Sequence, residues 1–86
     1  MQRRDFLLLR VAADRQIELS CERLYMRFVD ARVDRTVPRL MGTLADDLAG
    51  VTTVRLVDRS WLSSDEFKRE LDRVLDAFIG RGGRVV

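Results

Sequence analysis

The sequence predicts an α/β fold, a small single-domain mixed sheet in which an N-terminal antiparallel hairpin is followed by β-α-β-α-β and two helices lie on one face. Apolar and polar residues alternate over 16–21, with the period of a half-buried strand. Apolar residues recur at helical spacing over 37–48 and 63–78, and a run rich in β-branched residues, 51–57, separates these segments. Strands that alternate with helices predict right-handed crossovers and a mostly parallel sheet.

Length and composition limit the classes of protein and of site. The 86 residues suit one domain over 1–86, and a hydrophobic fraction of 47% is typical of a globular chain. One cysteine, Cys21, and no histidine exclude an internal disulfide, a Ser-His-Asp triad, a Cys-His pair and the usual zinc sites. A single thiol favours a reducing compartment, so we expect a cytoplasmic protein.

Charge is spread along the chain. Sixteen basic and fourteen acidic residues are interleaved and give a net charge of +2. A nucleic-acid-binding protein concentrates its positive charge on one face, so binding of nucleic acid is only an alternative function here. Residues 2–7, with Arg3 and Arg4, resemble the start of a twin-arginine export signal, but Arg10 interrupts the apolar stretch that must follow. We therefore expect neither export nor a membrane span.

The first third of the chain is predicted to form strands. Residues 5–11 and 16–21 predict an antiparallel hairpin with its turn near Asp14. Over 24–29 the alternation continues with its phase shifted by one residue, which predicts further strand after a β-bulge or a tight break at 22–23.

Local signals delimit the two expected helices. Thr36 is the expected N-cap of the first helix, and Gly50 is the expected stop. Ser63 and Glu66 form a capping box at the start of the second helix. That helix is expected to end at Gly80, before a last short strand over 84–86.

Two further expectations concern burial. Cys21, Met26 and Met41 are expected to fill the core. Two helices cover only one face of a sheet, so the other face should stay partly apolar and need a partner or a second copy of the chain as its cover.

Asp30 and Asp58 each follow a Val at the end of an expected strand. In an open α/β sheet such residues meet at the carboxyl edge, where ligands bind, so the pair could hold Mg²⁺ or supply a general base, with Asp34 and Asp65 nearby. Alternatively, Asp at a strand end bonds to local backbone N–H groups or pairs with an arginine such as Arg32 or Arg59. We expect the structural role, and so predict no catalytic residue, no metal and no cofactor.

The loop 58–64 is the best candidate for a binding surface. Trp61, the only tryptophan, is expected to act as a partner-binding anchor or as a lid packed over the end of the core. Ser63 and Ser64 stand at a helix N-terminus, which favours anions, but the acidic residues that follow oppose a phosphate there. The predicted partner-binding residues are Arg59, Trp61, Ser63 and Ser64.

Residues 44–86 resemble the small STAS domain of anti-sigma-factor antagonists. The matching pieces are 54–57 as a strand, Leu62-Ser63-Ser64, the helix through Phe78, and 81–86 with its two glycines. Leu62 stands where the family has an aspartate, and Asp65 where it has a glycine. The resemblance nominates Ser63 or Ser64 as a phosphorylated switch residue and implies a non-catalytic protein-binding module.

These observations together predict a non-catalytic protein-interaction module, an accessory or regulatory subunit that acts as a homodimer or within a larger assembly. The alternatives are a small Mg²⁺-dependent or carboxylate-based enzyme that uses Asp30 and Asp58, and an accessory factor that binds nucleic acid.

Overall fold

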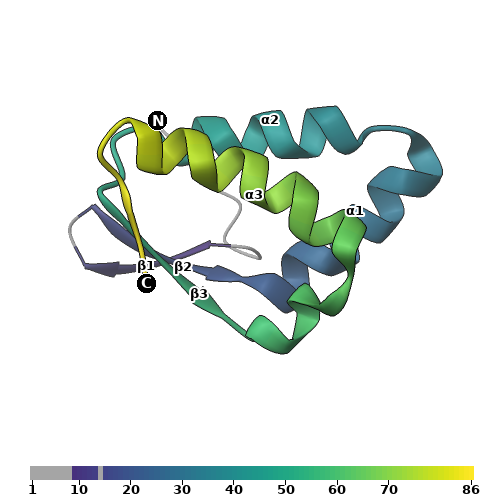
Figure 1. The fold of residues 1–86 in the computed structure, drawn as a ribbon, viewed down its shortest axis with the longest axis horizontal. Coiled ribbons are helices and arrows are strands. Elements are labelled where there is room, and N and C mark those ends of the chain that lie inside the picture. The colour runs from purple at the N-terminus through teal and green to yellow at the C-terminus, as the bar shows by residue number, and fades with distance from the viewer. Residues whose placement is uncertain (1–8, 14) are drawn as a thin grey trace.

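The computed structural model describes residues 9–13 and 15–86 and has a mixed α/β fold (Figure 1). One side of a four-stranded sheet is packed against helices. The elements in chain order are β1 (Leu9–Ala13), β2 (Gln16–Ser20), α1 (Cys21–Asp34), α2 (Val37–Asp47), β3 (Thr53–Val57), the 3-10 turn η1 (Arg59–Ser63), α3 (Asp65–Gly80) and β4 (Arg84–Val85).

The strand order of the sheet is β1-β2-β3-β4. Strands β2, β3 and β4 are parallel, and β1 pairs antiparallel with β2. The turn expected near Asp14 and the strand expected over 5–8 lie outside the described residues. After β2 the order is α1-α2-β3-α3-β4, so the expected β-α-β-α-β succession is only partly present and the helices number three in the described part of the chain.

The prediction of strand over 24–29 is wrong, because these residues lie in the middle of α1. Leu24 and Phe28 satisfy a period of two, but they also satisfy the i, i+4 spacing of a helix. The phase shift at 22–23 marks the first turn of the helix, not a bulge: the Ser20 side chain accepts the backbone N–H of Arg23 at 3.2 Å. The residues of α1 that face the core are Cys21, Leu24, Phe28 and Ala31.

The expectation for Met26 is therefore also wrong. Its side chain is 55% exposed, because a residue two positions from both Leu24 and Phe28 points away from their side of a helix. Cys21 and Met41 are buried, as predicted.

Helix α2 closely matches its predicted range. Thr36 occupies the N-cap position but makes no side-chain capping bond there. Gly50 has a φ of 79°, a conformation that glycine adopts without strain, in the turn that leads to β3.

The open face of the sheet is mostly polar along β2 and β3, so the expectation of a partly apolar face is not met in these two strands. Burial alternates along β2 and β3, with Ile17, Leu19, Val54 and Leu56 turned to the core. The residues at the intervening positions, all half-buried or exposed, are Gln16, Glu18, Ser20, Thr53, Arg55 and Val57. Because only Val57 among these is apolar, the open face of β2 and β3 does not require a hydrophobic cover.

None of the helices within residues 9–13 and 15–86 has the length and apolar character required to cross a bilayer.

Two glycines test the packing of this fold. A Cβ at Gly83 would lie 2.6 Å from Cδ2 of the buried Phe78 ring and still closer to two other ring carbons, whereas a Cβ at Gly42 on α2 would meet nothing within 4 Å. We expect Gly83→Ala to lower the free energy of unfolding by about 1–3 kcal/mol through overpacking. Gly42→Ala should raise it by about 0.5–1 kcal/mol through helix propensity. Urea unfolding followed by circular dichroism measures both, and equal effects would contradict the close approach of the Phe78 ring to Gly83.

Candidate functional site

The carboxyl ends of two parallel strands form one edge of the sheet. Ser20 at the end of β2 is paired in register with Val57 at the end of β3. The first turn of α1 and the turn η1 therefore emerge side by side, as Figure 1 shows. This is the edge where open α/β sheets bind ligands, and it is formed by β2 and not by the segment around Phe28.

Asp30 and Asp58 are not the ends of two neighbouring strands. Asp58 does follow β3, with a left-handed backbone (φ 57°), but Asp30 lies in the second half of α1. The premise of the two-carboxylate site is therefore wrong. In the described part of the chain, no group of three or more cysteine or carboxylate residues could hold a metal ion.

The arginines near these carboxylates have other partners. Arg32 forms a salt bridge with Glu66 on α3, with 3.3 Å between the nitrogen and the oxygen. Arg59 donates from Nε to the carbonyl oxygen of Leu56 at 3.4 Å. The first contact joins α1 to the start of α3, and the second holds η1 against the end of β3.

Trp61 lies on a series of aromatic rings that leads from the surface into the core. Its ring centroid is 5.5 Å from that of Tyr25 on α1, and Tyr25 meets Phe67 edge-on at 5.3 Å. Phe67 is also 5.3 Å from Phe28, and both of these rings are buried. Trp61 itself remains 36% exposed, so it covers the end of the core and also presents indole surface to solvent.

Ser64, and not Ser63, caps α3. The Ser64 side chain accepts the backbone N–H of Phe67 at 3.5 Å, while Ser63 is the exposed last residue of η1. The predicted capping box is displaced because η1 extends the loop by one residue before the helix begins. Glu66 accordingly pairs with Arg32 instead of closing a box with Ser63.

Cys21 occupies the first position of α1, at the same edge but beneath the surface. Burial raises the pKa of its thiol above the ordinary value of 9.0; the charge of Arg59 lowers it and that of Asp58 raises it further. The thiol is therefore held in its neutral form, which is the unreactive form of cysteine.

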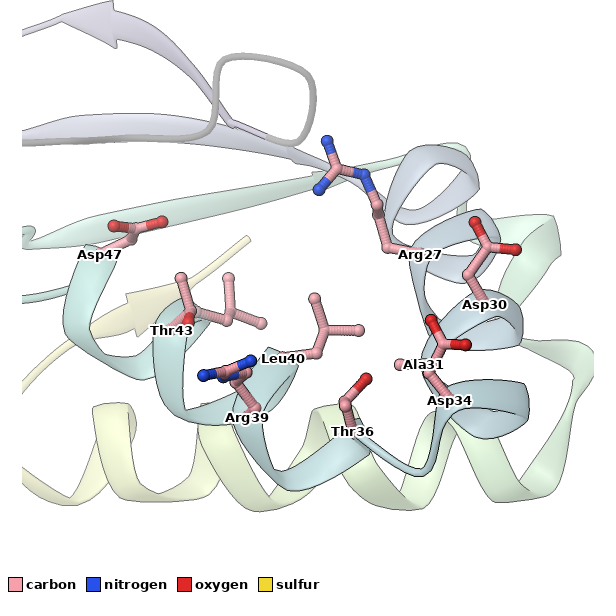
Figure 2. Close-up of a pocket in the computed structure, with 10 residues that line it drawn as sticks. Arg27, Asp30, Ala31, Asp34, Thr36, Arg39, Leu40, Thr43 and Asp47 are labelled. Carbon is pink, nitrogen blue, oxygen red and sulfur yellow. The ribbon is translucent and has the colours of Figure 1, made fainter.

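A cavity of about 280 Å³ lies between α1 and α2 (Figure 2). Its acidic lining residues are Asp30 and Asp34 on α1 and the buried Asp47 on α2, and two arginines, Arg27 and Arg39, balance most of their charge. Sequence reasoning missed this cavity because it placed 24–29 in the sheet. The helical spacing of the charged residues from Arg23 to Asp34 is the signal that could have revealed the side of the cavity formed by α1.

The two serines make a matched test of the cap. We expect Ser64→Ala to lower the free energy of unfolding by about 1 kcal/mol, because the N–H of Phe67 loses its acceptor. Ser63→Ala should change it by less than about 0.5 kcal/mol, since its side chain is exposed. Thermal unfolding of both variants measures these changes. A larger loss of stability in Ser63→Ala than in Ser64→Ala would show that Ser63 caps the helix, as predicted from the sequence.

The pKa shift of Cys21 predicts a dependence of stability on pH. A thiol whose pKa is higher in the folded than in the unfolded state binds more protons when folded, so its contribution to stability is lost as pH rises above the unfolded pKa. The stability difference between wild type and Cys21→Ala should therefore shrink between about pH 8 and pH 10, around the ordinary thiol pKa. Denaturant unfolding at the two pH values measures it, and a constant difference would contradict the raised pKa.

Comparison of the chain with family models, with curated proteins and with solved structures finds no match in any of the three.

Proposed function

We propose that this chain is a non-catalytic protein-interaction module, an accessory or regulatory subunit of the cytoplasm that acts as a homodimer or within a larger assembly. Its partner-binding surface, called here the rim surface, consists of Arg59, Trp61, Ser63 and Ser64 at the carboxyl edge of β3. The observation that carries the proposal is the partial exposure of Trp61, whose ring rests on that of Tyr25.

Tryptophan and arginine supply most of the energy of protein interfaces when their surfaces become buried on binding. Trp61 leaves about a third of its surface open, and its ring already rests on Tyr25, so binding would immobilise little additional side chain. Arg59 lies two residues away and is exposed, with its Nε held by Leu56. A supported indole and an anchored guanidinium two residues apart in the same turn are suited to a partner with an apolar centre and an acidic border.

The resemblance of 44–86 to STAS domains favours the same class of function. Ser63 is the more accessible of the two nominated switch residues, because Ser64 is engaged in the cap of α3. A phosphate on Ser63 would place about two further negative charges close to Asp65 and Glu66 and would repel an acidic partner from the rim surface.

The proposal is tested by affinity capture from native cells. We expect wild type to retain a specific protein and Trp61→Ala to retain at least about tenfold less of it, because the anchor is lost. Ile79→Ala is the matched control, since Ile79 is a 50% exposed apolar residue on α3, outside the rim surface, and this variant should capture normally.

Trp61→Phe separates loss of binding from loss of folding, because it keeps a ring on Tyr25. We expect it to stay folded and to recover part of the capture. Equal capture by wild type and a folded Trp61→Ala protein would overturn the proposal, as would equal losses in Trp61→Ala and Ile79→Ala.

A further inference from the structure

We propose that the outer face of α1 is the contact between two copies of this chain, which pair through antiparallel α1 helices about a two-fold axis near Val29. This inference deepens the proposed function, on whose homodimer it rests, by naming the surface and the geometry of that dimer. The surface is separate from the four residues of the rim surface.

An apolar stripe runs along the outer face of α1. Met26, Val29 and Val33 are 55%, 41% and 79% exposed and follow one another at helical spacing. They lie opposite the buried stripe that includes Leu24 and Phe28. Half of the large hydrophobic side chains exposed in the described residues stand on this one helix, the others being Trp61, Ile79 and Val86.

A row of charges borders the apolar stripe on the side of α2. Arg23, Arg27, Asp30 and Asp34 recur at the spacing of one helix face, and three of them follow one another along α1 in Figure 2. The two positive charges come first and the two negative charges second. The sign changes between Arg27 and Asp30, the interval that contains Val29, the middle residue of the apolar stripe.

A second copy of α1 that runs in the opposite direction presents the same charges in the reverse order. Positive charges of one copy then lie opposite negative charges of the other. In a two-fold antiparallel pair of helices, one border of the stripe faces the same border of the other copy, running in the opposite direction. Arg23 of one copy then faces Asp34 of the other, and Arg27 faces Asp30. A parallel two-fold pair would place this border against the opposite border of the stripe, so the row of charges can meet itself only in the antiparallel arrangement.

The apolar stripe and the row of charges have the same centre, close to Val29. This shared centre favours a second copy of the chain as the partner that covers the outer face of α1. One rotation about Val29 brings the apolar stripes together and also matches the charges in their borders. An unrelated partner would place no such symmetry requirement on the sequence of α1. The mostly polar open face of β2 and β3 offers no competing apolar stripe.

Analytical ultracentrifugation over a range of concentrations tests the interface. We expect wild type to show a monomer–dimer equilibrium and Val29→Asp to weaken dimerisation at least about tenfold, because a charge would enter the middle of the apolar contact. Ile79→Asp is the matched control: it places the same charge on an exposed apolar residue of α3 and should leave the equilibrium unchanged. A wild type that stays monomeric at millimolar concentration would overturn the inference.

Two charge reversals test the geometry. Arg23→Asp and Asp34→Arg each create like-charge contacts in their own homodimers and should weaken them, whereas an equimolar mixture should form the heterodimer, in which both contacts are attractive. Both substitutions suit the dipole of α1, since they place an acid in its first turn and a base in its last turn. The cap of Ser20 uses only the backbone of residue 23 and is unaffected.

Failure of the mixture to dimerise more strongly than either variant alone would overturn the antiparallel arrangement. Loss of the dimer in Val29→Asp with partner capture through Trp61 intact would support the dimer interface as separate from the rim surface. Monomeric wild type that still captures its partner would overturn this inference alone, and a dimer with no captured partner would overturn only the function proposed for the rim surface.

Discussion

The contact between Phe28 on α1 and Phe67 on α3 is the constraint on which the other features depend. The two rings lie 5.3 Å apart and are almost completely buried. They fix how α1 is rotated about its axis, because a helix that buries Phe28 must also bury Leu24 and Ala31 on the same side. Tyr25 then lies at the border of the core, where it meets Phe67 on one side and supports Trp61 on the other. The position of the exposed indole thus follows from a contact inside the protein.

The same rotation of α1 decides what the rest of the helix presents. With the aromatic side turned inward, Met26, Val29 and Val33 face solvent and the charged row from Arg23 to Asp34 runs along α2. One helix therefore contributes to the support of Trp61, to the wall of the cavity in Figure 2 and to the proposed dimer face. The salt bridge of Arg32 with Glu66 ties the helix to the start of α3 from outside the core. An exposed ion pair of this kind adds less stability than the buried rings, which carry most of the packing.

Much of the second half of the chain was predictable, because its signals are local. The β-branched run before Asp58, the apolar spacing of α2 and α3, and the position of Trp61 between a strand and a helix need no distant contact to be recognised. The predicted start of α3 was wrong by one residue. Either of two adjacent serines could cap the helix, and Ser64 is the cap because the turn η1 extends through Ser63. The segment 24–29 was mistaken for a strand because Leu24 and Phe28 fit both periods in so short a window. That error also hid the cavity and moved Asp30 to the wrong edge.

The sequence by itself determined which stretches are β3, α2 and α3, and it carries the order of charges along α1, because spacing within a segment is enough to encode each of these. Only the tertiary structure decided that 21–34 is a helix, which of its sides is buried, and that β2 is the parallel neighbour of β3. The physical reason is that these outcomes rest on contacts between residues far apart in the chain, such as Phe28 with Phe67. Burial of those rings outweighs the weak local preference that left the segment open to either conformation.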